Sequence, residues 1–399
     1  MSAALDLRQG STRHGDPVQR ARALAPLIAA AAGEVEASRS LPPALLDALH
    51  GAALFRTLLP RACNGEETDP ATYVRMLETV AQQDASTAWC IGQASGCSMA
   101  AAYLEPEIAW EMWGGDPRAA LAWGAGPQGM AQVVAGGYVV TGTWGFASGG
   151  RHATWLGGHC RVTELDGSPR LGAGGELAER TMLFRKNAAD MRDTWQVMGL
   201  RGTGSDTYSV QQLFVPDRYS VCRDTDAERR QFGALYRFTT THLYAAGFAG
   251  VALGIARGAL DALVEVARGK TPSATARGLR DSPVVQSAIA QAEAKLRAAR
   301  ALLLTTLQDA WDEAQQTSAL SLDSRMSIRL ASTYAIHQAK EVTSTAYQEA
   351  GATAIFESNP FERRFRDAHS VSQQVQARTT HFETVGQHLL GLDVNQRFV

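Results

Sequence analysis

Two glycine-rich segments in the middle of the chain carry the residue types best suited to ligand chemistry. Residues 144–149 read Trp-Gly-Phe-Ala-Ser-Gly, which puts an aromatic pair beside a turn serine. Trp144 and Phe146 could form an apolar wall against a planar ring, and Ser148 could hydrogen-bond its edge. A pair of core aromatics followed by a turn serine fits equally, and spacing alone favours this structural interpretation.

The second segment, residues 201–205, reads Arg-Gly-Thr-Gly-Ser. Arg201, Thr203 and Ser205, with the backbone amides between them, could bind phosphate or ring oxygens. The segment is not GxGxxG and does not open a helix, so it predicts no Rossmann-type dinucleotide site. A tight β-turn explains it equally well, and both interpretations stay open.

The metal-binding and disulfide-forming residue types show no pattern. The five cysteines and nine histidines are dispersed, without CxxC or HExxH spacing. We therefore expect buried free thiols, no disulfide framework and no metal site. A lone helix histidine such as His369 or His381 is more often structural than catalytic.

Composition is that of an ordinary globular protein with more than one domain. The chain has 399 residues, 45% of them hydrophobic and 20% charged, with a formal net charge of −2. No broad basic field is present, so nucleic acid and anionic membranes are poor partners. No apolar run reaches membrane-spanning length and the N-terminus lacks a secretory h-region, so we expect a cytoplasmic protein.

Three regions must position the two segments, and together they predict an α+β fold. Residues 16–118 carry helical periodicity, and the Asp69-Pro70 pair is a strong helix start. Residues 119–228 hold short β-rich runs, two of them joined by Gly136-Gly137 as in a hairpin. Residues 229–399 are helical again. The sequence thus predicts an N-terminal helical domain, a middle β-barrel domain and a C-terminal four-helix bundle domain.

The individual helices and the chain start follow from the same periodicities. We expect the residues before about Gly15 to be disordered. The long helices are predicted at 17–38, 241–267, 283–314, 321–350 and 365–390.

The motifs resemble the acyl-CoA dehydrogenase superfamily. Residues 54–92 are similar to an N-terminal segment of that family, and residues 199–205 with 213–216 are similar to its barrel signature. Residues 361–368 resemble the start of its last bundle helix. Each motif alone is weak, but three in the correct order across a helix–barrel–helix plan are fairly specific.

Within the superfamily, the chain is most similar to the flavin-dependent monooxygenase branch, through residues 84–89, 144–149 and 197–205. Members of this branch receive reduced flavin from a separate reductase and are usually homotetramers. The resemblance implies a flavin, FMN or FAD, held between the barrel and the bundle. It makes six residues candidate cofactor ligands: Trp144, Phe146, Ser148, Arg201, Thr203 and Ser205.

The glutamate base of the acyl-CoA dehydrogenases is missing at both places where the resemblance puts it. One place falls near Val375, between Gln374 and Gln376, and the other near Thr240. An amide cannot accept a proton usefully at neutral pH. Glu383, further along the last helix, is better explained as a solvated or interface residue.

The monooxygenase branch often uses one histidine on the last helix and one on the second helical segment. The matching positions here are Gln374 and Cys97. Gln374 could still donate a hydrogen bond, and His381 lies seven residues on, hence on the same face of one helix. We name Gln374, His369 and His381 as candidate catalytic residues. Cys97 and Trp89 are the candidate substrate-binding residues.

Three functions remain open from sequence. The favoured one is a flavin-dependent monooxygenase that uses reduced flavin and O2 to oxygenate an aromatic or other small organic substrate. The second is an acyl-CoA dehydrogenase that uses FAD for α,β-dehydrogenation of an acyl thioester. The third is a non-catalytic protein that kept the flavin fold, because both expected catalytic sets are incomplete.

Overall fold

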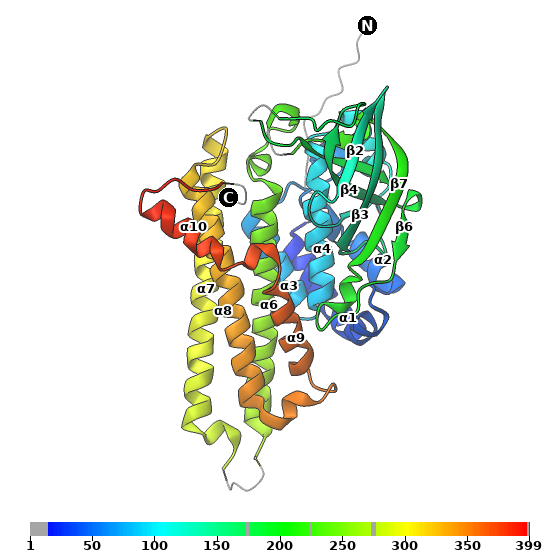
Figure 1. Cartoon of the computed structure of the whole chain (residues 1–399). Helices are drawn as coiled ribbons and strands as arrows, with labels where there is room; N and C mark the ends of the chain where they lie inside the picture. The colour runs from blue at the N-terminus through cyan, green and yellow to red at the C-terminus, as the bar shows by residue number, and fades with distance from the viewer. Residues whose placement is uncertain (1–14, 173–174, 224–225, 273–276, 397–398) are drawn as a thin grey trace.

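The N-terminal and C-terminal regions of the chain are helical, and the region between them in sequence forms a sheet (Figure 1). The computed structural model describes residues 15–172, 175–223, 226–272, 277–396 and 399. The predicted disorder before Gly15 therefore lies outside the described residues. A mixed α+β fold is confirmed, whereas the domain boundaries 16–118, 119–228 and 229–399 stay a prediction.

The N-terminal helices begin where the sequence places caps and prolines. Asp69 accepts a hydrogen bond from Thr72 N at 2.8 Å, with Pro70 in the first turn behind it. The helix at 17–38 is confirmed as predicted. The helices of this region are α1 Pro17–Ser38, α2 Pro43–Gly51, α3 Pro70–Ala81, α4 Ala85–Ser98 and α5 Pro106–Ala109.

The sheet has eight strands in the order β6-β7-β3-β2-β4-β5-β8, with β1 paired in parallel to β4. The predicted hairpin is present: β2 and β3 pair antiparallel around Gly136, whose φ of 76° suits glycine. Closure into a barrel stays a prediction. The strands are β1 Leu121–Trp123, β2 Gly129–Val134, β3 Gly137–Ala147, β4 Trp155–Thr163, β5 Glu179–Arg185, β6 Asp190–Arg192, β7 Asp206–Pro216 and β8 Ser220–Val221.

Trp144 fills the core of this sheet. Its side chain has no accessible surface, and its Nε1 donates to His159 O at 2.9 Å. The indole lies over three strand glycines, 129, 142 and 158, where an added Cβ would come within 2.6 Å of the ring or closer. A ring enclosed in this way has no face to offer a ligand. The expectation that Trp144 forms a flavin wall is therefore wrong, and the core-aromatic interpretation holds.

The C-terminal region contains three long helices and two short ones. The predictions for the long helices are confirmed, but the predicted fourth helix at 365–390 is wrong, because the chain breaks at Gln374. Gln374 has extended backbone (ψ 163°), and its side chain accepts from Gln376 N at 2.7 Å, which starts a new turn. The helices are α6 Thr240–Gly269, α7 Pro283–Gln316, α8 Leu322–Ala350, α9 Phe361–Val371 and α10 Thr380–Leu389.

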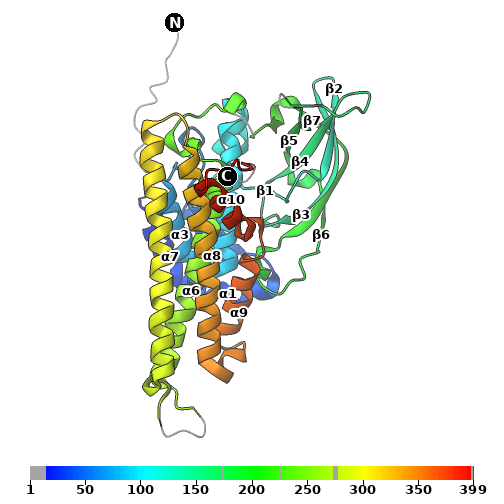
Figure 2. The ribbon, with the colours of Figure 1, turned by 60° about the vertical axis from the view of Figure 1, so that its left-hand side comes forward.

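Helix α6 is the centre of the molecule, with α7 and α8 running alongside it (Figure 2). Small residues let α3 cross it closely, since a Cβ on Gly254 would lie 2.4 Å from Glu78 O. By length and composition α6 could cross a membrane, but 72% of its apolar window is buried inside the protein, as in a core helix. On its other side α4 packs between α6 and the sheet (Figure 1), where it contacts strand β1.

Replacing Trp144 should damage stability far more than replacing its neighbour Phe146. W144A removes a fully buried indole and should lower the free energy of unfolding by about 3–5 kcal/mol. F146A changes a side chain that is 64% exposed and should cost no more than about 0.5 kcal/mol. Urea denaturation of both variants measures the difference, and equal losses would contradict the core assignment of Trp144.

Candidate functional site

Four side chains form one buried hydrogen-bonded chain where α4 meets the sheet. Trp89 Nε1 of α4 donates to Ser148 Oγ at 3.0 Å, and Ser148 Oγ lies 2.6 Å from Ser205 Oγ. Ser205 Oγ lies 2.7 Å from Thr203 Oγ1, which donates to Leu200 O at 2.8 Å. The structure thus brings together one predicted substrate residue, Trp89, and three predicted cofactor ligands.

The direction of this chain follows from counting hydrogens. Each hydroxyl has one hydrogen to donate, and Thr203 uses its own on Leu200 O. Ser205 must therefore donate to Thr203, and Ser148 to Ser205. Ser148 accepts from Trp89 and keeps one lone pair, so it offers an acceptor to any ligand.

A row of aromatic rings extends from this chain along α4 and α6. Trp89 stacks on Phe248 with ring centroids 3.8 Å apart, and Phe248 stacks on Tyr244 at 5.4 Å. Tyr244 Oη lies 3.3 Å from Cys97 Sγ, and Gln93 Nε2 donates to the same sulfur at 3.6 Å. The two predicted substrate residues, Trp89 and Cys97, therefore stand at opposite ends of one row.

The far end of the row is uncharged at neutral pH. Burial raises the pKa of the Cys97 thiol to about 12. Burial, with the nearby thiol, also raises the pKa of Tyr244 well above its usual value. Cys97 is thus a neutral thiol rather than a nucleophile.

Beside the hydroxyl chain, two aromatic rings keep accessible surface. Phe146 adopts a left-handed backbone (φ 63°) and stays 64% exposed, with its ring 5.8 Å from Trp195 in an edge-to-face arrangement. Trp195 Nε1 donates to Leu200 O at 3.0 Å. Arg201 is partly exposed and lies 3.7 Å from Glu36, while its buried Nε has no partner among the described residues.

The three candidate catalytic residues do not gather at one point. Gln374 starts the turn between α9 and α10, and its buried Nε2 has no partner in the described part of the chain. His369 Nε2 lies 3.4 Å from Ser344 Oγ, and His381 Nε2 lies 2.8 Å from Val375 O. The shared helix face predicted for Gln374 and His381 is wrong, because these residues sit on either side of the break.

Asp367 anchors the loop that carries the predicted cofactor ligands. Its Oδ1 accepts from Leu200 N at 2.6 Å, and Gly199 packs so closely on α9 that a Cβ would lie 2.3 Å from Arg366 O. Burial, with repulsion from Asp84, raises the pKa of Asp367 to about 7, even though the Leu200 N–H opposes the shift.

Sequence reasoning missed Phe248, Tyr244 and Trp195. The first two lie about 150 positions beyond α4 and meet it only through the packing of α6. No local spacing signals such a contact. Trp195 stands shortly before the Arg-Gly-Thr-Gly-Ser segment. A single tryptophan in a predicted loop beside a candidate ligand segment could have indicated its role.

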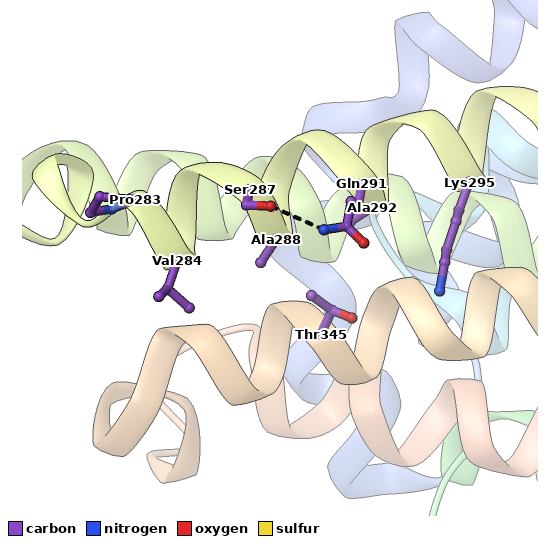
Figure 3. Close-up of a pocket in the computed structure, with 8 residues that line it drawn as sticks. All are labelled: Pro283, Val284, Ser287, Ala288, Gln291, Ala292, Lys295 and Thr345. Carbon is purple, nitrogen blue, oxygen red and sulfur yellow. Dashed lines mark hydrogen bonds between the residues drawn. The ribbon is translucent and has the colours of Figure 1, made fainter.

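The structure also has a surface groove away from the hydroxyl chain and the aromatic row. A groove of about 520 Å³ runs between α7 and α8, lined by residues such as Val284, Gln291 and Thr345 (Figure 3). It shares no residue with the hydroxyl chain or the aromatic row. Among the described residues no three His, Cys, Asp or Glu side chains gather as a metal site would require.

Comparisons with known proteins agree with this architecture. The family model described as acyl-CoA dehydrogenase, C-terminal domain, matches residues 246–378. Indole-3-acetate monooxygenase of Pseudomonas putida is 29% identical over 362 residues, covering 90% of each chain. The oxygenase component of FADH(2)-dependent resorcinol hydroxylase from Rhizobium sp. (strain MTP-10005) is 28% identical over 393 residues, covering 94% of each.

Two solved structures are similar over almost the whole chain. The 3-HSA hydroxylase from Rhodococcus sp. RHA1 superposes with a TM-score of 0.88 at 26% identity, covering 96% of this chain and 99% of that one. XiaF from Streptomyces sp., in complex with FADH2 and glycerol, has a TM-score of 0.87 at 25% identity, covering 95% and 96%.

Residues 246–378 match the C-terminal domain of the acyl-CoA dehydrogenases, and the whole chain has the fold of solved monooxygenases, so the resemblance to this superfamily predicted from the sequence is confirmed. Within it, the chain groups with the flavin-dependent monooxygenases and is an enzyme of that flavin-using class.

Replacing Asp367 should change how stability depends on pH. Because its folded pKa of about 7 lies above the ordinary 3.8, the native state binds an extra proton between these values. The free energy of unfolding should therefore fall as pH rises from 4 to 7, by up to about 1.4 kcal/mol per pH unit from this group. The D367N variant lacks the group, so the wild-type minus D367N difference should decline across that window.

Chemical denaturation at a series of pH values measures this difference. Asp312 is an exposed carboxylate on α7, so D312N serves as the control and should follow the wild-type curve. A difference curve for D367N that stays flat from pH 4 to 7 would contradict the assignment.

Proposed function

We propose that this chain is the oxygenase component of a two-component monooxygenase, which uses reduced flavin and O2 to oxygenate a small aromatic substrate. The observation that supports it most is the directed hydroxyl chain at Ser148, beside a row of buried aromatic rings. Two of the similar proteins are named for their action on indole-3-acetate and on resorcinol, which are small aromatic compounds.

The described residues fit a flavin ring. An isoalloxazine presents ring oxygens and nitrogens that accept hydrogen bonds, and the buried donor Arg201 Nε lacks a partner among the described residues. Phe146 and Trp195 provide exposed apolar edges beside the same loop. In this proposal Phe146, Ser148, Arg201, Thr203 and Ser205 remain the cofactor residues, and Trp195 takes the place predicted for Trp144.

The polarity at Ser148 suits the reduced flavin. Oxidised isoalloxazine has a bare nitrogen at N5, which requires a donor, whereas the reduced ring carries an N–H there. Ser148 already donates its hydrogen to Ser205 and has only a lone pair to offer. A site built this way favours the reduced ring, which a separate reductase would deliver; relatives named as oxygenase components support this partner.

The chain's own residues would hold the substrate and exclude water. Bound reduced flavin supplies the two electrons that activate O2, so that one oxygen atom enters the substrate and the other leaves as water. Trp89 and Phe248 are each no more than 8% exposed and form a dry wall that starts beside Ser148, and the fully buried Cys97 stands at its far end. Gln374 Nε2 is a free donor, and its proposed role is to orient a reacting oxygen rather than to take a proton.

The dehydrogenase alternative lacks its base in this structure as well. Val375 and Thr240 occupy the expected positions, and Glu383 is exposed on α10. A homotetramer remains part of the proposal by resemblance, and a cytoplasmic location remains the expectation from the sequence.

The direct test supplies the protein with reduced FAD or FMN, 18O2 and a panel of aromatic acids and phenols. We expect a product that carries one labelled oxygen atom, detected by mass spectrometry, and no bleaching of oxidised flavin by acyl-CoA thioesters. Bleaching by a thioester without any labelled product would reject the proposal in favour of a dehydrogenase. Absence of flavin binding in either redox state would favour the non-catalytic alternative.

Replacing Ser148 should remove the preference for reduced flavin. S148A deletes the acceptor, so anaerobic titration should show the affinity for reduced flavin falling about tenfold while the affinity for oxidised flavin changes less. The control is S98A, which removes a buried α4 hydroxyl that donates to Ser95 O at 2.7 Å. An unchanged ratio of the two affinities in S148A would contradict the polarity argument.

A further inference from the structure

Arg223 lies beside the predicted substrate residue Cys97 and forms no ion pair with any described residue. Its guanidinium lies 4.4 Å from the centre of the Trp123 ring, and Nη1 donates to Thr240 Oγ1 at 3.2 Å. Nη2 donates to Thr181 Oγ1 at 3.4 Å. Nε is buried and without a partner, and the ion pairs of the described residues do not include Arg223.

The two carboxylates that follow Arg223 most closely along the described chain are already used. Asp226 pairs with Arg229, with Oδ1 and Nη1 2.9 Å apart. Glu228 pairs with Arg180, with Nη1 and Oε1 2.6 Å apart, and also accepts from Cys222 N at 2.9 Å. The charge of Glu228 is therefore balanced by Arg180. Nothing in that pair is available to neutralise Arg223.

The titratable groups around Arg223 are neutral at physiological pH. Burial, assisted by the charge of Arg223, lowers the pKa of His159 to about 3. Cys97 and Tyr244 also feel this charge, and burial keeps both protonated. A partly buried cation without a counter-charge is costly, and a bound anion would remove that cost.

Arg223 lies next to the Cys97 end of the aromatic row and can be reached from solvent. The Trp123 backbone hydrogen-bonds the Cys97 thiol, and the Trp123 ring under the guanidinium lies 5.1 Å from the His159 ring. Arg223, His159 and Tyr244 each keep part of their surface accessible to solvent. An anion that reaches the guanidinium would therefore lie beside the aromatic row.

We infer that Arg223 binds the carboxylate of a small aromatic acid, which is the substrate of the proposed oxygenase. The reaction rests on the proposed function, whereas the binding does not. Nε and the remaining Nη hydrogens form a fork that matches a carboxylate. Thr240 accepts from Arg223 and keeps its own O–H to donate to the same anion. Tyr244, which keeps part of its surface accessible, then lies beside the aromatic ring.

The test compares acids with neutral analogues of the same shape. Indole-3-acetate and 4-hydroxyphenylacetate, and the corresponding amides, are titrated into the protein by anaerobic calorimetry, with and without reduced FAD. We expect each acid to bind at least about tenfold more tightly than its amide. R223Q should remove this difference, R223K should keep part of it, and T240V should reduce it.

Arg218 provides a matched control. Its guanidinium also lies over an aromatic ring, 5.2 Å from the centre of Tyr219, but the side chain is exposed. R218Q should leave the ratio of acid to amide affinity unchanged, and thermal unfolding checks that all four variants are folded. Equal affinities for acid and amide in the wild type, a full acid preference in R223Q, or no binding of any probe would each overturn the inference.

Turnover measured in parallel separates the two proposals. Acid binding that depends on Arg223, without any oxygenated product, would retain the carboxylate site and reject the oxygenase. Oxygenation of neutral aromatics without preference for acids would retain the oxygenase and reject the role of Arg223.

Discussion

The backbone of Leu200 is the point on which the arrangement of the site depends. Its N–H donates to the buried Asp367 of α9, and its carbonyl accepts from both Thr203 and Trp195. One residue with a left-handed backbone (φ 53°) thereby ties the last helices to the sheet and ends the hydroxyl chain. Because every hydroxyl upstream donates toward that carbonyl, the acceptor presented by Ser148 is a consequence of how Leu200 is held.

Trp144, which the sequence suggested as a ligand contact, instead makes the sheet rigid. Trp144 occupies space that three strand glycines leave open, so the strand ending at Ser148 has a fixed position. The chain from Trp89 to Thr203 requires donor and acceptor atoms to stay within about 3 Å of each other across three elements. Trp144, which lies four residues before Ser148 in the chain, therefore supports the site without touching a ligand.

The sequence allowed the element order, the long helices and the superfamily to be predicted, because caps, prolines and periodicity act locally. Asp69, Pro70 and Gly136 each determine the conformation of their own few residues. The same reasoning failed at Gln374, where a side-chain cap interrupts an otherwise helical pattern. It could not decide between wall and core for Trp144, since that choice depends on which face of a strand is covered. Arg223 could not be singled out from the sequence, because its lack of an ion-pair partner among the described residues depends on which side chains the fold brings near it.

Helix α4 is buried along its entire length, with all 14 residues enclosed between the sheet and α6. Small residues such as Gly92 and Gly96 make that enclosure possible. During synthesis, however, α4 leaves the ribosome long before α6 does. Until Phe248 has emerged, the nascent chain leaves the apolar side of α4 uncovered, which exposes it to aggregation at that stage of folding.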